Sequence, residues 1–206
     1  YAAVSAALHA REAKLLTQAM AERMIDAATP EESYKTLLEC GYAPLERCTL
    51  ENVEHALSQA RRELYREVSV LAPDKRIIEL FQIKYDYHNA KLALKSKRSG
   101  EDVSRLAMDC GRFDAQKVLR GETSAVSAAM SRAMAQAESE AGHSGDVRMA
   151  ELLLDRACYE EMSALASETG STFLKDYVAL QIDAVNLRTL VRARRMGLSL
   201  IHISEP

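Results

Sequence analysis

The sequence predicts an all-α protein, and three observations support that prediction. Residues that lose little rotamer freedom in a helix are plentiful, whereas aromatic residues make up only 5% and Trp is absent. Only four prolines and eight glycines punctuate the 206 residues, too few for the many tight turns of an all-β fold. No segment alternates apolar and polar residues for long enough to indicate a strand.

The first hundred residues predict four helices. Apolar residues recur at helical spacing from Ala2 to Ala27, and Thr29 and Pro30 are typical of an N-cap and a first helical position. The predicted helices span 2–27, 30–41, 51–71 and 74–97. Thr49 can cap the third helix, Pro73 breaks it, and Gly100 closes the fourth.

A similar pattern follows in the second half. The predicted helices span 101–110, 122–141, 146–167 and 171–196, with a short helix or turn over 113–119. Gly111, Gly170 and Gly197 end three of these segments, and His143-Ser144-Gly145 predicts a hinge.

An internal repeat is the most informative local feature. Residues 62–72 read RELYREVSVLA, and residues 156–166 read RACYEEMSALA. Six of these eleven positions are identical at a shift of 94, among them Tyr65 with Tyr159 and Glu67 with Glu161. Shared helical periodicity alone matches apolar positions and does not place polar residues in register, so we interpret the match as a duplication.

The following helix repeats as well. Residues 86–100 read DYHNAKLALKSKRSG, and residues 183–197 read DAVNLRTLVRARRMG. At a shift of 97, Asp86 matches Asp183 and Asn89 matches Asn186. We therefore predict a first helical unit with an N-terminal helix over 1–100 and a second unit over 101–198.

The repeat resembles a known family. The helix KYDYHNAKLALKSK over 84–97 and its second copy, Asp183-Ala-Val-Asn186-Leu-Arg188, are similar to the aspartate–asparagine helix of the V/A-type ATPase C subunits, called d in eukaryotes. The opening residues 11–16, REAKLL, resemble the N-terminal helices of that family. The resemblance implies a funnel of three pseudo-equivalent helical units between the membrane rotor ring and the central shaft of the ATPase head.

The chain departs from that family pattern in two ways. Two of the expected three units are present, and the last residues, 199–206, do not continue the helical pattern and resemble a non-native tail. A truncated record of a longer subunit is the first interpretation, and a natural two-unit protein is the alternative. Truncation predicts that apolar residues of the last helix face water, with Val178, Ile182, Val185 and Leu190 as candidates.

Composition and motifs argue against several other functions. The net charge of −3 gives no pull toward nucleic acid, and no phosphate-binding GxxxxGK[ST] loop occurs. We expect no catalytic, cofactor or metal site, because the histidines and the four cysteines lack ligand spacing. The thiols are expected to be reduced, and the paired carboxylates Glu31-Glu32 and Glu160-Glu161 to be solvated.

The Asp–Asn pairs admit two interpretations. Asp86 with Asn89, and Asp183 with Asn186, lie three apart and share a helix face. They could contact the rotor ring or the shaft, or they could bind the backbone of a neighbouring loop within each unit. The presence of the pair in both copies favours the internal role.

Basic residues end both repeat helices. They are Lys91, Lys95, Lys97 and Arg98 in the first copy, and Arg188, Arg192, Arg194 and Arg195 in the second. They complement the helix dipole, and the alternative is electrostatic contact with acidic partner loops or anionic lipid, for which Arg188, Arg192 and Arg195 are the candidates. Tyr65 and Tyr159 are expected to pack at helix–helix contacts.

The resemblance implies a non-catalytic central-stalk subunit of a rotary ATPase. It would couple the shaft to the rotor ring during proton or sodium transport linked to ATP synthesis or hydrolysis. Its partners would be the shaft subunits and the ring, with no nucleic acid and no small-molecule substrate, and it would lie peripherally on the cytoplasmic face of the membrane. The alternative is a free-standing helical repeat scaffold for protein–protein interaction.

Overall fold

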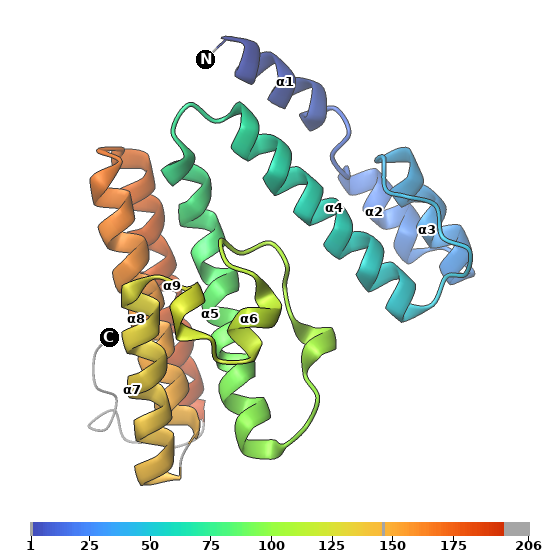
Figure 1. Cartoon of the computed structure of the whole chain (residues 1–206). Helices are drawn as coiled ribbons and strands as arrows, with labels where there is room; N and C mark the ends of the chain where they lie inside the picture. The colour runs from blue at the N-terminus through green and yellow to red at the C-terminus, as the bar shows by residue number, and fades with distance from the viewer. Residues whose placement is uncertain (1, 146, 196–206) are drawn as a thin grey trace. The chain divides into compact units, whose positions relative to one another are not determined.

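The computed structural model describes residues 2–145 and 147–195, and these contain helices and no strand. The prediction of an all-α protein is therefore confirmed. The chain divides into two compact units, Tyr1–Lys75 and Arg76–Pro206, which are described separately (Figure 1).

The helices follow the predicted order. In the first unit they are α1 (Ala2–Glu12), α2 (Gln18–Ile25), α3 (Pro30–Glu39) and α4 (Leu50–Leu71). In the second they are α5 (Lys75–Ser99), α6 (Ala115–Leu119), α7 (Ala128–Ser144), α8 (Val147–Glu168) and α9 (Thr172–Arg195). Two short 3-10 turns, η1 (Ser104–Leu106) and η2 (Thr123–Ala125), flank α6.

Threonine caps organise the first unit. Thr29 accepts a hydrogen bond from the backbone N–H of Glu32 and Thr49 accepts one from Asn52, as the sequence predicted for α3 and α4. The single helix expected over 2–27 is wrong, because α1 ends at Glu12 and α2 begins at Gln18. The side chain of Thr17 caps α2 by accepting from the N–H of Met20, and this bond starts a new helix there.

The first unit has a small core. Among its described residues only Tyr34 and Ala56 are buried hydrophobic side chains. The Tyr34 hydroxyl donates to the carbonyl of Ala43 at 2.7 Å, which ties α3 to the following segment. Helices α2 and α3 pack together, and Arg23 bonds Glu39 across them at 2.6 Å.

The second unit holds the main core. Helix α8 packs between α7 and α9, and α5 contributes Leu80, Ile83 and Tyr87 to the same apolar cluster. Figure 1 shows α5 running alongside these three helices. Gly100, Gly145 and Gly170 follow the ends of α5, α7 and α8 with positive φ, which closes each helix at low cost.

The segment between α5 and α7 differs from the prediction. The helix expected over 101–110 is wrong, since that stretch contains only η1, and α7 begins at Ala128 rather than near Glu122. The backbone N–H groups of Met108, Arg112 and Phe113 bond side chains of α5. Residues 113–119, expected as a short helix or turn, do contain a short helix, α6.

Three sequence-based expectations are not tested by the fold. Helices α4 and α5 belong to different compact units, so the division at residue 100 and the equivalence of the α4–α5 pair with the α8–α9 pair stay predictions. The tail over 199–206 lies outside the described residues.

Candidate functional site

Asp86 holds the loop that follows η1. Its side chain is fully buried on α5, and Oδ1 accepts hydrogen bonds from the backbone N–H of Arg112 at 2.9 Å and of Phe113 at 3.2 Å. The other oxygen, Oδ2, accepts from Nε of Arg112 at 2.7 Å. Three donors therefore meet a single carboxylate inside the protein.

Asn89, one helical turn after Asp86, binds the backbone of the same loop. Its Nδ2 donates to the carbonyl of Met108 at 2.9 Å, and its Oδ1 accepts from the N–H of the same residue at 2.9 Å. Gln82 also donates to the carbonyl of Cys110 at 3.2 Å. The amide side chain of Asn89 thus pairs with the loop as a neighbouring strand would.

Gly111 is required by this close approach. A Cβ atom placed on Gly111 would lie 2.2 Å from Oδ1 of Asp86, well inside van der Waals contact. The loop can deliver two N–H groups to Asp86 only because the residue before Arg112 has no side chain.

Arg112 extends the network to α8. Its Nη1 donates to Oε1 of Glu161 at 2.8 Å, and the same carboxylate accepts from the hydroxyls of Tyr87 at 2.9 Å and Ser127 at 3.1 Å. Ser127 also caps α7 by accepting from the N–H of Met130. The network therefore joins α5, the loop, α7 and α8.

Burial and the main neighbouring charge act in opposite directions on the pKa of Asp86 and in the same direction on the pKa of Tyr87. Burial raises the pKa of Asp86, and the hydrogen bonds and positive charge of Arg112 oppose that effect. Burial and the neighbouring Glu161 carboxylate raise the pKa of Tyr87. Nη2 of Arg112 is buried with no hydrogen-bond partner among the described residues. The network thus satisfies most of its polar atoms internally and fixes the loop against three helices.

The second Asp–Asn pair lies in a different environment. Asp183 and Asn186 are exposed on α9, and neither bonds another described residue. The internal role that the sequence favoured matches the geometry of Asp86 and Asn89 within this part of the chain. For Asp183 and Asn186 that role stays a prediction.

Glu161 corrects one expectation. The sequence predicted that Glu160 and Glu161 are solvated, and this is wrong for Glu161, whose side chain is only 14% exposed. Glu160 does lie at the surface, where it pairs with Arg156. The signal for Glu161 was its identity with Glu67 in the repeat, whereas Arg112 has no matching residue in the chain.

The basic residues of the two copies also differ. Lys91, Lys95 and Lys97 pair with Asp155, Glu151 and Glu138 of α7 and α8 at 2.6, 2.6 and 2.9 Å. Arg188, Arg192 and Arg195 are exposed on α9. Tyr159 packs against the main core and Tyr65 is half-buried.

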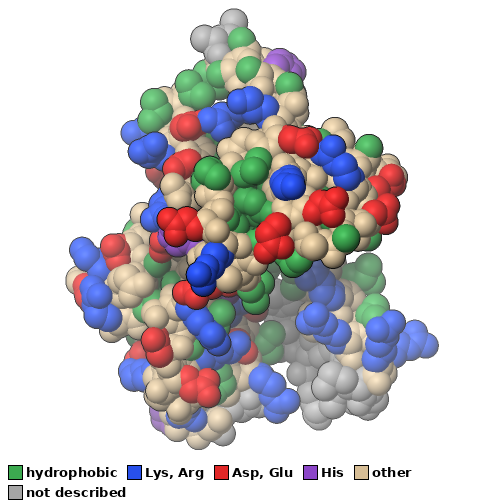
Figure 2. Space-filling view, turned by 90° about the vertical axis from the view of Figure 1, so that its right-hand side faces the viewer, with side chains coloured by type: hydrophobic (Ala, Val, Ile, Leu, Met, Phe, Trp, Pro, Cys, Tyr) green, Lys and Arg blue, Asp and Glu red, His purple; other side chains and the backbone are tan. Residues whose placement is uncertain are grey.

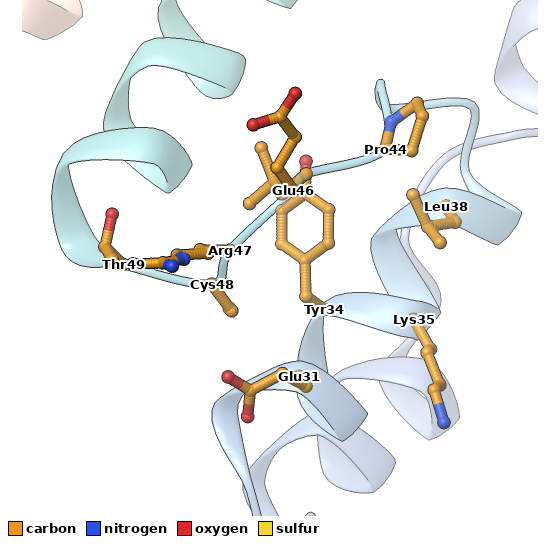
Figure 3. Close-up of a pocket in the computed structure, with 10 residues that line it drawn as sticks. Glu31, Tyr34, Lys35, Leu38, Pro44, Glu46, Arg47, Cys48 and Thr49 are labelled. Carbon is orange, nitrogen blue, oxygen red and sulfur yellow. The ribbon is translucent and has the colours of Figure 1, made fainter.

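The surface of the first unit has an open hollow. Residues of α3 and the segment 44–49 line it, and the ring of Tyr34 extends from α3 toward that segment (Figure 3). Burial raises the pKa of Tyr34, but its hydroxyl already bonds Ala43. Figure 2 shows acidic, basic and hydrophobic side chains interspersed on the face in view.

Neither a metal cluster nor a membrane span occurs in the part of the chain that the structure describes. That part contains no group of three His, Cys, Asp or Glu side chains placed to hold a metal ion. None of its helices is both long enough and apolar enough to cross a membrane.

The comparisons with known proteins agree on one family. The model of the family described as ATP synthase (C/AC39) subunit matches residues 4–206. The C subunit of the A-type ATP synthase from Methanocaldococcus jannaschii is 23% identical over 100% of this chain and 57% of its own length.

Two further relatives agree with that result. The C subunit of the V-type ATP synthase from Thermus thermophilus is 24% identical over 97% of this chain and 65% of its own length. The C subunit of the V-type sodium ATPase from Enterococcus hirae is 21% identical over 90% of this chain and 58% of its own length. The chain therefore spans less than two thirds of the length of these relatives.

Proposed function

Because this chain belongs to the ATP synthase (C/AC39) subunit family, we propose that it is part of a non-catalytic central-stalk subunit of a V/A-type rotary ATPase. In this role it couples the shaft of the ATPase head to the membrane rotor ring while ions move and ATP is made or consumed. The observation that carries the proposal is the family match over residues 4–206.

The packing of the second unit supports this role. Torque transfer needs a body that resists deformation, and close-packed helices provide one. The network around Arg112 adds polar links from the loop at Asp86 to Glu161 on α8.

Partners are proposed from the same family membership. We place the protein peripherally at the cytoplasmic face, between the shaft subunits and the rotor ring. The exposed Arg188, Arg192 and Arg195 of α9 are candidates for contact with acidic partner loops or lipid headgroups. Nucleic acid, cofactors and small-molecule substrates have no part in this role.

The test compares membrane vesicles with and without the full-length protein. We expect vesicles that lack it to hydrolyse ATP without building an ion gradient, and the added protein to restore the gradient. The isolated protein is expected to show no ATP binding by calorimetry. An ion gradient that is unchanged without this protein would contradict the coupling role and favour the helical scaffold.

A further inference from the structure

Helix α5 is the point at which the chain enters the second unit. The division between the compact units falls between Lys75 and Arg76, so α5 is the first helix of the second unit. A force that the first unit passes along the covalent chain therefore reaches the second unit at the start of α5. From there it reaches α7 and α8 through the loop after α5, or through the side chains that α5 presents to them.

A row of polar bonds joins α5 to α8 along most of the length of both helices. The distances in this row lie between 2.6 and 3.0 Å. From the start of α5 to its end, the partners are Arg76 with the carbonyl of Glu168, Tyr87 with Glu161, Lys91 with Asp155, and Lys95 with Glu151. Because the partners run in opposite directions along the two helices, α5 and α8 are antiparallel and bonded in a fixed register.

Arg112 adds a buried link near the middle of this row. Its Nε lies 2.7 Å from Asp86 on α5, and its Nη1 lies 2.8 Å from Glu161 on α8. The side chains of Arg112 and Glu161 are both 14% exposed, so salt screens this link less than the outer pairs, where Lys95 is 51% exposed. We call the row and the Arg112 link together the α5–α8 seam.

Helix α9 meets α8 in a different way. It contributes Leu174 and Val178, each 2% exposed, to the apolar cluster to which α8 also belongs. The expectation that Val178 faces water is therefore wrong, and Ile182 packs against the same cluster. Of the other candidates for exposure, Val185 is half-buried and Leu190 is 42% exposed. What joins α9 to α8 in this cluster is apolar contact.

Apolar contacts and polar bonds respond differently to a force along a helix axis. The hydrophobic effect has no direction and depends on the area removed from water, so it resists separation of two helices more than sliding. A hydrogen bond or ion pair depends on the distance and angle between two particular groups. A slip of α5 along α8 by one helical turn, about 5.4 Å, would separate every pair of the seam at once.

We propose that torque passes through the second unit along the α5–α8 seam, and that Lys91, Lys95 and Arg112 are the positioning residues that prevent this seam from sliding. The inference rests on the proposed coupling role and adds to it the residues that carry the force. A weakened seam leaves the fold intact, because the apolar cluster still holds α5. It lets α5 shift along α8 when the ion gradient opposes rotation.

The experiment returns variants of the full-length protein to membrane vesicles that lack it. Lys91→Asp places a like charge opposite Asp155, and we expect the steady-state ion gradient to fall. The double variant Lys91→Asp with Asp155→Lys restores an opposite pair and is expected to restore the gradient. The initial rate of ion uptake should be unchanged in both variants, because no gradient opposes rotation at that stage. Lys95→Met is a milder variant, and we expect it to lower the gradient less.

The matched control changes an ion pair that lies within one helix. Arg156 and Glu160 are both on α8, and their side chains lie 2.8 Å apart. Arg156→Asp makes the same change of charge as Lys91→Asp but affects no bond between two helices that the structure shows. We therefore expect it to leave the steady-state gradient unchanged.

Each outcome decides the proposal. A lower gradient with unchanged initial uptake in Lys91→Asp, and its recovery in the double variant, supports it. An unchanged gradient in Lys91→Asp, no recovery in the double variant, or an equal loss in Arg156→Asp overturns it. A parallel fall in initial uptake also overturns it, because a seam that only resists load leaves unloaded transport intact.

The seam and the coupling role can fail separately. If vesicles without the protein build the same gradient as complete vesicles, the coupling role itself is wrong. If the unaltered protein restores the gradient and Lys91→Asp restores it equally well, only the assignment of the seam is wrong.

Discussion

Arg112 lies between two carboxylates. Because its side chain is buried, the loss of either ion pair affects the free energy of unfolding strongly. The side chain is 14% exposed and bonds Asp86 at 2.7 Å and Glu161 at 2.8 Å. Removal of one partner from a buried ion pair leaves the other charged and desolvated. Arg112→Ala is expected to lower the free energy of unfolding by roughly 3–5 kcal/mol in denaturant titration.

The control is an ion pair of the same length that lies at the surface. Nε of Arg120 lies 2.7 Å from Glu122, but these side chains are 58% and 41% exposed. Arg120→Ala is therefore expected to cost at most about 1 kcal/mol. Equal losses for the two variants would show that burial does not set the strength of these pairs.

The effect of Arg112→Ala also depends on pH. Burial raises the pKa of Asp86, and without Arg112 less opposes that rise. A raised carboxyl pKa favours the folded state at low pH, and this benefit is lost as pH rises through the folded pKa. The stability difference between the variant and the unaltered protein is therefore expected to be smallest near pH 4, about the pKa of a free carboxyl, and to widen above it.

The four cysteines should differ in reactivity. Burial raises the pKa of Cys158 to about 12, and Cys110 is also buried, whereas Cys40 and Cys48 are half-buried. Alkylation requires the thiolate. Iodoacetamide at pH 8 is expected to modify Cys40 and Cys48 in the folded protein, and Cys158 only after unfolding, as read by mass spectrometry. Equal labelling of Cys158 and Cys40 without denaturant would contradict this.

At this scale the sequence could predict part of the site. The repeat singled out Asp86 and Asn89, since polar residues that are identical in both copies of the repeat indicate a shared structural role. It did not identify Arg112, because an arginine in a loop carries no periodic signal and its partners lie 26 and 49 residues away. Burial of a charged group depends on tertiary packing, which a single segment does not encode.

The loop before α6 is held mainly by side chains of α5, so its stability depends on close approach. Gly111→Ala places a Cβ against Oδ1 of Asp86 and must push the loop or the carboxylate away. Such overpacking typically costs about 1–3 kcal/mol, and we expect a lowered midpoint of thermal unfolding.

Gly142 is the matched control for that substitution. It lies inside α7, and a Cβ there meets nothing within 4 Å. Gly142→Ala is expected to stabilise the protein by roughly 0.5–1 kcal/mol, because alanine has the higher helix propensity. A rise in the midpoint for Gly111→Ala as well would contradict the tight contact with Asp86.

Helix boundaries were predicted best where a local signal sets them. Thr29 and Thr49 fix the starts of α3 and α4 through hydrogen bonds within a few residues, and Pro73, which has no N–H to donate, follows the end of α4. The helix expected over 101–110 was wrong, because Met108, Arg112 and Phe113 donate to side chains about 20 or more residues away. A pattern within one segment does not report such long-range bonds.

For the whole molecule, large apolar side chains are exposed in both units. The second unit has a large core, yet Phe173, Leu180 and Leu187 of α9 are 72%, 64% and 63% exposed. These 206 residues on their own are expected to bind a hydrophobic dye, and Leu180→Lys with Leu187→Lys to reduce that fluorescence several-fold. The matched control is the double variant Val70→Lys with Leu50→Lys in the first unit. It adds the same charge to the protein and leaves α9 unchanged. Equal fluorescence for both double variants would contradict the assignment to α9.

The contact between Gly111 and Asp86 also has an evolutionary consequence. A Cβ at 111 would lie 2.2 Å from Oδ1 and 3.2 Å from Cγ of Asp86, so the exclusion depends mainly on the side chain at 86. Among homologues, the two positions should therefore covary: lineages that lose the acid at 86 are free to replace the glycine. Lineages that keep the acid should keep the glycine even where the rest of the loop has diverged.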